Sequence, residues 1–109
     1  ALERLRELRL KCCRLAEFPD VSCNPALTEL DVSDNKIAEL PVARFARAPL
    51  EFFNLENNEL AHLPPELGLK ETIRTLMLEG NPLRSIRRPI LQRGTPAVLA
   101  YLRDKLPSA

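Results

Sequence analysis

The sequence predicts an α/β solenoid with a parallel concave sheet of four short strands, a convex side of 3₁₀ turns and loops, and a carboxyl-terminal helical cap. Leucine accounts for 21 of the 109 residues, against four Phe, one Tyr and no Trp. Apolar positions recur at a nearly constant period over residues 5–86, and the pattern after residue 86 is helical. A fixed period of a few tens of residues is the signature of a repeat architecture.

Four segments carry the repeat, LRELRLKCCRLAEFP, LTELDVSDNKIAELP, LEFFNLENNELAHLP and IRTLMLEGNPLRSIR, and they start at Leu5, Leu27, Leu50 and Ile73. Each contains an apolar pair two residues apart, which is the spacing of a strand with one buried face. In the first repeat this places Leu8 and Leu10 inward and Arg9 outward. Strands of successive repeats then pair in parallel.

The ninth position of the repeat is occupied by Cys13, Asn35, Asn58 and Asn81. An inward carboxamide at a tight turn satisfies backbone groups of its own and the adjacent repeat. The sequence therefore predicts a structural ladder at this position, with Cys13 as the substitute in the first repeat.

The chain returns on the convex side through residues 41–49 and 64–72, where Phe45, Leu67 and Leu69 are the expected inward anchors. The first return is one residue shorter, and Val21 or Cys23 takes that role. Frequent proline in these short segments favours 3₁₀ turns over full helices.

The repeats written LxxLxLxxNxLxxLP resemble the leucine-rich repeat superfamily, in its intracellular class of about 23 residues ending in LP. The resemblance implies four repeats over residues 1–86, followed by a helical cap over residues 87–109. It also implies repeat-mediated protein interaction, without a defined activity. Residues 81–107, NPLRSIRRPILQRGTPAVLAYLRDKLP, resemble the carboxyl terminus of one subfamily.

The carboxyl end carries the pattern of a lid. A short helix after residue 86 is expected to end at Gly94 in a left-handed conformation, with Thr95 as the N-cap of a second helix of roughly ten residues. Its inward stripe contains Val98, Leu99, Leu102 and Leu106, with Tyr101 beside it and Ile90 and Leu91 covering the same repeat. The alternative is an amphipathic helix that binds a partner.

The amino end has no comparable lid. Leu2 continues the spacing of a preceding return segment, so the chain is expected to be a carboxyl-terminal fragment of a longer array. The first strand and the inner face of Leu5, Leu8 and Leu10 are then exposed, which predicts self-association through this end.

The third, fifth and seventh repeat positions project from the concave sheet and are the expected contact surface. Phe52 and Met77 are its apolar members, and such residues suit adaptable protein contacts. The predicted partner-binding set is Glu29, Asp31, Phe52, Asn54, Glu56, Met77 and Glu79. The carboxylates would favour basic residues on the partner. The alternative is a solvated sheet whose charges pair across strands, such as Arg9 with Asp31.

A net charge of +1 disfavours nucleic acid as a partner, and short apolar runs exclude membrane insertion. A basic cluster near the cap is expected to be a solvated surface, since no aromatic residues are interleaved with it for base stacking. It consists of Arg84, Arg87, Arg88, Arg93, Arg103 and Lys105.

Cys12, Cys13 and Cys23 form no disulfide framework, and the only histidine, His62, is far from them in sequence, so no metal site is expected. Buried or half-buried free thiols in a reducing compartment are the preferred interpretation, with a cytoplasmic location and the nucleus not excluded. No catalytic constellation and no cofactor motif is visible, because no nucleophile has a matched base.

We therefore expect a non-enzymatic scaffold that binds a protein partner of unknown identity. Two alternatives remain. One is an end segment of an array with no partner site of its own, and the other is a regulatory repeat in a phosphatase or GTPase pathway.

Overall fold

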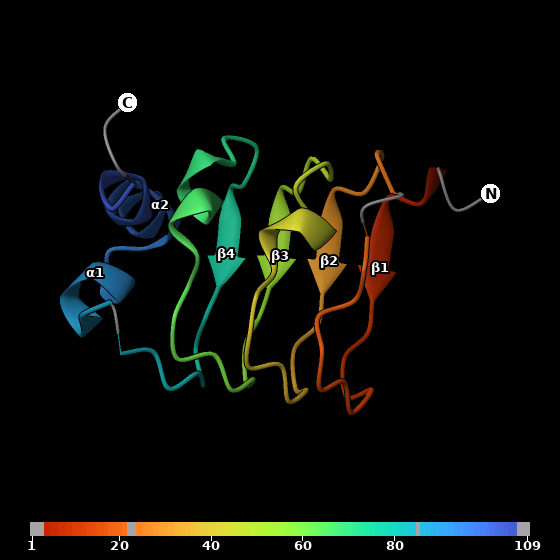
Figure 1. The fold of residues 1–109 in the computed structure, drawn as a ribbon, viewed down its shortest axis with the longest axis horizontal. Coiled ribbons are helices and arrows are strands. Elements are labelled where there is room, and N and C mark those ends of the chain that lie inside the picture. The colour runs from red at the N-terminus through yellow and green to blue at the C-terminus, as the bar shows by residue number, and fades with distance from the viewer. Residues whose placement is uncertain (1–3, 22–23, 85, 107–109) are drawn as a thin grey trace.

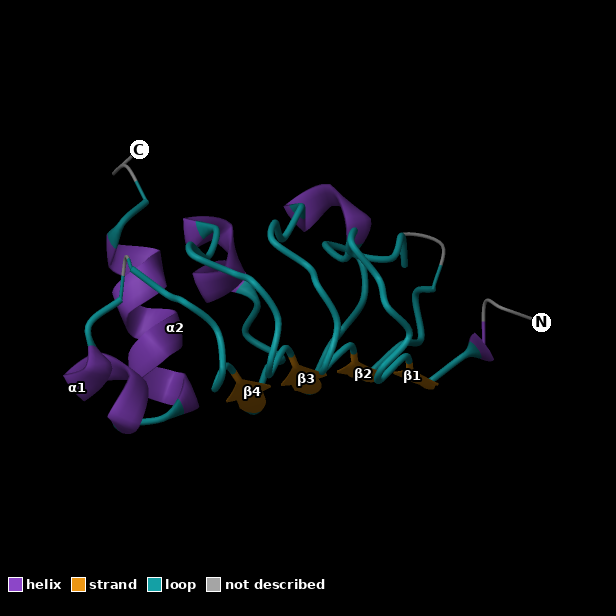
Figure 2. Cartoon of the chain, turned by 90° about the horizontal axis from the view of Figure 1, so that it is seen from below, coloured by secondary structure: helices purple, strands orange, loops and turns teal. Residues whose placement is uncertain are grey.

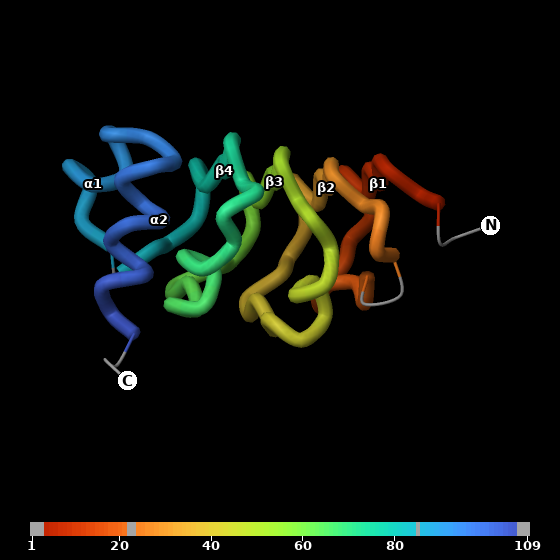
Figure 3. Tube along the Cα trace, turned by 90° about the horizontal axis from the view of Figure 1, so that it is seen from above, coloured from red at the N-terminus to blue at the C-terminus, as the bar shows by residue number. Residues whose placement is uncertain are grey.

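The computed structural model describes residues 4–21, 24–84 and 86–106 and confirms the predicted solenoid. The strands lie side by side, the two helices stand at the β4 end, and the returning segments lie on the opposite side of the sheet (Figures 1 and 2). Viewed from above, each repeat forms one coil (Figure 3). The elements are β1 (Glu7–Arg9), β2 (Glu29–Asp31), η2 (Val42–Arg44), β3 (Phe52–Asn54), η3 (Pro65–Leu69), β4 (Thr75–Met77), α1 (Arg88–Gln92) and α2 (Thr95–Asp104).

All four strands are parallel and follow the chain order β1-β2-β3-β4. Their central residues Leu8, Leu30, Phe53 and Leu76 are partners in register. Leu30 and Phe53 are fully buried, because alternate residues of a strand point to opposite faces and these point into the core. The period-2 pattern thus predicted the correct face of each strand.

An aromatic cluster joins the first three repeats. The rings of Phe18, Phe45 and Phe53 lie with centroids 5.4 to 5.9 Å apart in edge-to-face and tilted arrangements. All three are at most 1% exposed. Phe53 is the central residue of β3, Phe18 lies at the last apolar position of the first repeat, and Phe45 is the predicted anchor of its return segment.

The first repeat is packed less completely than the others. Leu5, Leu8, Leu10 and Leu15 are half-buried, whereas the corresponding residues of the second and third repeats are buried. A rung of a solenoid needs a neighbour on both sides to bury its apolar face. In the described part of the chain, β1 has a neighbour on one side only.

The asparagines of the ladder connect each repeat to the one before it. Asn35 accepts hydrogen bonds at Oδ1 from the backbone N–H groups of Cys13 and Leu15, at 3.0 and 2.9 Å. Its Nδ2 donates to the carbonyls of Leu10, Val32 and Ser33 at 2.8 to 3.0 Å. Asn58 and Asn81 repeat this pattern one and two repeats later.

Cys13 departs from the prediction because it is exposed, as is Cys12. Its thiol reaches only the carbonyl of Lys11, at 3.6 Å from Sγ. A thiol is shorter than a carboxamide and has a single weak donor, so it supplies one contact where Asn35 supplies several. The expectation of buried or half-buried thiols is wrong for both residues, while Cys23 and Leu2 lie outside the described residues.

The convex side contains the predicted 3₁₀ turns, η2 and η3. Val21, Phe45 and Leu67 are buried as anchors, but Leu69 is 58% exposed. In η3 successive residues turn by about a third of a circle, so Leu67 and Leu69 cannot face the same side. The expectation that both point inward was therefore wrong.

The cap closes the β4 end through α1 and α2. Val98, Leu99 and Leu102 are buried, as predicted, whereas Leu106 lies beyond the end of α2 and is half-buried. Gly94 has the expected positive φ of 97° but precedes α2 as its N-cap residue, so the assignment of Thr95 as N-cap was wrong.

Thr95 instead covers the outer edge of β4. Its Oγ1 lies 2.9 Å from the backbone nitrogen of Leu76, and 3.5 Å from the Leu76 carbonyl oxygen. In a parallel strand alternate residues direct their peptide groups to alternate sides, so Leu76 directs its groups away from β3. The threonine hydroxyl satisfies them in place of another strand.

Thr95→Val is expected to lower the free energy of unfolding by about 1–2 kcal/mol, because it keeps the side-chain shape and leaves the Leu76 N–H without its partner. Urea denaturation measures the loss. Thr75→Val is the matched control on an exposed strand position, with an expected change within about 0.5 kcal/mol. Equal losses in the two variants would contradict the role of the Thr95 hydroxyl.

Candidate functional site: the concave surface

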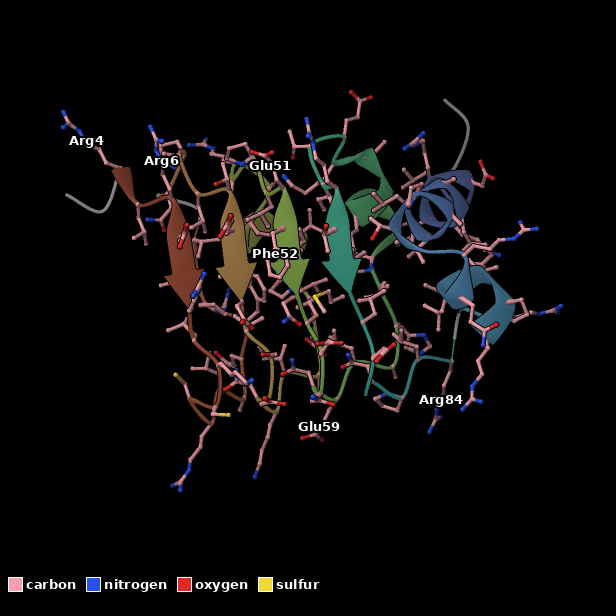
Figure 4. All side chains as sticks on the ribbon, turned by 180° about the vertical axis from the view of Figure 1, so that it is seen from behind. Arg4, Arg6, Glu51, Phe52, Glu59 and Arg84 are labelled. Atoms are coloured by element: carbon pink, nitrogen blue, oxygen red, sulfur yellow. The ribbon has the colours of Figure 1, made fainter. Side chains whose placement is uncertain are left out.

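The concave surface consists of the side chains that the strands direct away from the core. Register places Glu7, Glu29, Phe52 and Thr75 in one row, and Arg9, Asp31, Asn54 and Met77 in the next. Figure 4 looks at the strands from behind and shows Phe52 lying over this side of the sheet. The sheet thus forms a continuous surface of charged, polar and apolar side chains.

Phe52 lines a hollow of about 330 Å³ near the amino end of the sheet. The other lining residues are Leu8, Arg9, Glu29, Leu30 and Asp31. Phe52 is half-buried, so its ring covers part of this hollow and still has an accessible face. The surroundings combine apolar area with charges of both signs.

Met77 lines a second hollow of about 600 Å³, where β4 meets the cap. Leu83 and Leu91 contribute apolar surface, Arg88 and Gln92 of α1 supply polar groups, and Glu56 and Glu79 contribute carboxylates. The strands alone do not make this hollow. The sequence had treated α1 as a lid only, so Arg88 and Gln92 were missed as members of the site.

Phe52 and Met77 lie on adjacent strands, in different rows of the concave surface. Phe52 is the register partner of Thr75 and Met77 that of Asn54, so the two apolar residues are diagonal neighbours. They line separate hollows. The two apolar residues therefore offer two contact points on neighbouring strands.

Asn54 is a poor contact residue because it is buried, with 9% of its surface exposed. Its Oδ1 accepts a hydrogen bond from the backbone N–H of Glu56 at 3.0 Å. One repeat earlier, Asp31 Oδ1 accepts from the N–H of Ser33 at 3.0 Å and from its hydroxyl at 2.6 Å. These are the local turns that Asn and Asp form with the residue two positions on.

Asn54 therefore presents little of its side chain to a partner, and Ser33, at the seventh position of the second repeat, is buried as well. The signal was present in the sequence as a short polar residue immediately after the apolar centre of the strand. Asp31 keeps a half-exposed side chain with one oxygen engaged in the turn.

Four carboxylates of the contact set have no ion-pair partner within the described residues, namely Glu29, Asp31, Glu56 and Glu79. The expected cross-strand pair of Arg9 with Asp31 is not formed. Arg9 Nη2 lies 3.6 Å from Glu7 Oε2 on the same strand. The concave surface therefore carries negative charge that no described side chain neutralises in a direct ion pair.

A third hollow, of about 530 Å³, lies on the convex side and is lined in part by Val42, Leu69 and Lys70. Burial lowers the pKa of the Lys70 ammonium group below its ordinary value. Lys70 Nζ donates to the Ala46 carbonyl at 2.9 Å and lies 6.0 Å from the centre of the Phe45 ring. Lys70 is thus engaged in packing between neighbouring repeats.

The remaining chemical candidates stay apart. In residues 4–21, 24–84 and 86–106, no three His, Cys, Asp or Glu side chains come together as metal ligands. His62 is exposed, and Cys12 lies near Asp34, with 3.7 Å from Sγ to Oδ2. The basic residues of the cap are exposed, and Arg103 donates from Nε to the Gly68 carbonyl at 3.1 Å.

Curated proteins from several animals are similar to this chain. A transforming growth factor beta activator, LRRC32, of Pongo abelii is 36% identical over 66 residues, which make up 59% of this chain and 10% of that protein. The leucine-rich repeat serine/threonine-protein kinase 1 of Mus musculus is 35% identical over 83 residues, or 68% of this chain and 4% of the kinase. Its counterpart in Caenorhabditis elegans is 32% identical over 118 aligned positions, covering 97% of this chain and 5% of that kinase.

The chain is distantly homologous to leucine-rich repeat proteins. The parallel sheet with one strand per repeat agrees with that relationship. No family model matches the chain. The chain spans a tenth or less of the length of these relatives.

Leucine-rich repeat homology implies a protein-interaction role in general. In the part of the chain that the structure describes, no helix has the length and apolar character required to cross a membrane.

Proposed function

We propose that the chain is a non-catalytic scaffold of an intracellular protein that binds a protein partner on its concave surface. The observation that carries this proposal is the hollow between β4 and α1. Met77 and Leu91 give it an apolar lining, and Glu56 and Glu79 lie at the same hollow with no ion-pair partner among the residues that the structure describes. A partner segment with one apolar side chain flanked by Lys or Arg complements this arrangement.

The hollow beside Phe52 supplies a second contact. Aromatic residues at an interface contribute large contact area at low entropic cost, and Phe52 has both Glu29 and Asp31 close to it. An extended partner segment lying across the strands would meet the Phe52 hollow and then the Met77 hollow. Two separate anchor points would fix its direction on the sheet.

We also propose a closer relationship within the leucine-rich repeat proteins. Residues 81–107 resemble the carboxyl terminus of leucine-rich repeat-containing protein 40, including its plant relatives. The described part of that segment contains the end of the fourth repeat and the whole of α1 and α2. The full-length sequence tests the scaffolding role, because a catalytic domain in it would oppose a purely scaffolding function.

A peptide library provides the binding test. Each peptide carries one Leu, Met or Phe flanked by Lys and Arg, and a matched peptide has Glu in place of the basic residues. We expect binding only to the basic series, with affinity reduced about tenfold by Met77→Ala and by Glu79→Gln, because the first removes apolar contact and the second a charge. Fluorescence anisotropy of labelled peptides measures the affinities. Phe52→Ala is expected to weaken the longer peptides that reach both hollows.

Glu59→Ala is the control, since Glu59 is exposed at the turn beyond the strands (Figure 4). It should leave the affinity unchanged. If the Met77→Ala and Phe52→Ala variants bind the peptides as tightly as the unmodified chain, the proposal that Phe52 and Met77 contact the partner is wrong. The closure of β4 by Thr95 would then favour the alternative function, an end segment that terminates an array.

A further inference from the structure

Charge is distributed unevenly along the chain. Residues 80–109 contain six basic residues and one acidic residue, Asp104, whereas residues 1–79 contain ten basic and fourteen acidic residues. The net charge of +1 is therefore the sum of a basic segment and an acidic remainder. Such a separation creates a local field that attracts groups of the opposite charge to each part of the surface.

Four of the six basic side chains belong to α1 and its flanks, and we call them the arginine surface. They are Arg84, Arg87, Arg88 and Arg93. All four residues are exposed, and none has an ion-pair partner among the described residues. Arg87 and Arg93 are the cap residues at the two ends of α1, and Figure 4 shows Arg84 projecting outward. Like charges gathered in this way repel one another, so an anionic partner would stabilise them.

The other two basic residues of residues 80–109 are engaged within the chain. Arg103 donates from Nε to the Gly68 carbonyl at 3.1 Å, and Lys105 Nζ lies 4.9 Å from the centre of the Tyr101 ring. The guanidinium groups of the arginine surface have no comparable contact among the described residues. A guanidinium group presents its N–H donors in a fixed fork that matches the two oxygens of a carboxylate.

The fold places the arginine surface beside the hollow at Met77. Arg88 and Gln92 are four residues apart, so they lie on one face of α1, and both line that hollow. Glu56 and Glu79 line the same hollow from the segments that follow β3 and β4. The hollow is therefore the place where the acidic concave surface meets the arginine surface.

We propose that the arginine surface binds an acidic segment of the protein partner, which continues from the basic segment held at the Met77 hollow. The inference rests on the proposed function, because the apolar side chain in the hollow fixes the position of the partner segment. A segment that leaves the hollow over α1 passes from carboxylates to guanidinium groups, so its own charge must change sign there. The partner is thus recognised by the order of its residues, basic, apolar and then acidic.

Nucleic acid and anionic membranes fit this surface less well. Both carry negative charge throughout, so either would also face Glu56 and Glu79 at the hollow. Base stacking needs exposed aromatic rings, and Tyr101 of the cap is half-buried. Among the described residues the exposed large apolar side chain is that of Leu69, in η3, so the arginine surface presents none for insertion into lipid.

Fluorescence anisotropy with extended peptides tests the inference. Each peptide starts from a basic peptide with one apolar residue and adds a run of Glu at its amino or its carboxyl end, and matched peptides add Gln instead. We expect at least one of the two Glu extensions to bind about tenfold more tightly than its Gln counterpart at about 0.1 M salt. The gain should disappear at about 1 M salt, where exposed charges are screened within about 3 Å.

The double variant Arg87→Gln, Arg93→Gln locates the contact, because neither residue lines the hollow. It should remove most of the gain from the Glu extension and leave the affinity for the unextended basic peptide within about twofold. Arg47→Gln, at an exposed position of the convex side, is the matched control and should change neither affinity. Circular dichroism checks that each variant is folded.

Glu extensions that bind no more tightly than Gln extensions would overturn the inference, as would a gain that persists in the double variant. So would arginine-dependent binding to phosphatidylserine vesicles or to a single-stranded oligonucleotide without any gain from the Glu extensions. Failure of the unextended basic peptides to bind would contradict the proposed function and this inference with it. Failure of the extension alone contradicts only the inference, so the two failures are distinguishable.

Discussion

Asn58→Ala is expected to lower the free energy of unfolding by about 3 kcal/mol. Asn58 is 5% exposed and makes four hydrogen bonds. Its Oδ1 accepts from the N–H of Ile37 at 3.1 Å, and its Nδ2 donates to the carbonyls of Val32, Leu55 and Glu56 at 3.0 to 3.2 Å. Alanine leaves the buried Ile37 N–H of the preceding repeat without a partner, which costs about 1–3 kcal/mol. It also removes three bonds to carbonyls, of which Val32 and Leu55 keep a second bond, from Asn35 and Asn81.

Guanidinium unfolding followed by far-ultraviolet circular dichroism measures this loss by linear extrapolation. Glu59→Ala, at the adjacent exposed position, is the control and should change stability by less than about 0.5 kcal/mol. Asn81→Ala should lie between the two, because Asn81 is half-buried and makes three of the four bonds. If the asparagine ladder contributed nothing to stability, all three variants would have the same free energy of unfolding.

Most of the architecture was predictable because it follows from the spacing of apolar residues within and between the repeats. The spacing of Leu30, Phe53 and Leu76 fixed the strands and their buried face, and the cap stripe of Val98, Leu99 and Leu102 was visible at helical spacing. Periodic burial is a local property, since each repeat presents the same residue to the same neighbour. A sequence with one repeat per strand therefore specifies its own register.

The details that were mispredicted depend on what lies beside a residue rather than on its period. Cys13 was assigned to the buried ladder by position, but it is exposed. Leu69 was assigned to the core by residue type, but η3 turns it outward. Thr95 was assigned as an N-cap by its place before a helix, but the nearest unsatisfied peptide group belongs to β4.

The candidate site was predictable in part for the same reason. Register placed Glu29, Phe52 and Met77 on one surface from the sequence alone. The hollow beside Met77 could not be derived from period, because it needs Arg88 and Gln92 from a helix packed against the last repeat. Contacts between the cap and the sheet are set by tertiary packing, which no repeat position encodes.

That packing is tested by Gly68→Ala, which is expected to lower the free energy of unfolding by about 2–3 kcal/mol. Gly68 is buried in η3, and a Cβ at this position would lie 2.6 Å from both the backbone nitrogen of Arg103 and the carbonyl oxygen of Leu99 in α2. Backbone atoms of a helix cannot rotate away as a flexible side chain can. The whole of α2 would have to move off η3 to admit one methyl group.

The loss from Gly68→Ala should concentrate in the cap. Hydrogen exchange is expected to accelerate in α2, where Val98, Leu99 and Leu102 lose their cover, before it changes in β2 and β3. Leu69→Ala is the neighbouring control and should cost less than about 1 kcal/mol, because this side chain is 58% exposed. If Leu69→Ala destabilised the chain as much as Gly68→Ala, the close approach of α2 to η3 would be wrong. Arg88 and Gln92 line the Met77 hollow only while the cap is packed against β4. Gly68→Ala, which moves α2 away from η3, should therefore also weaken peptide binding at this hollow.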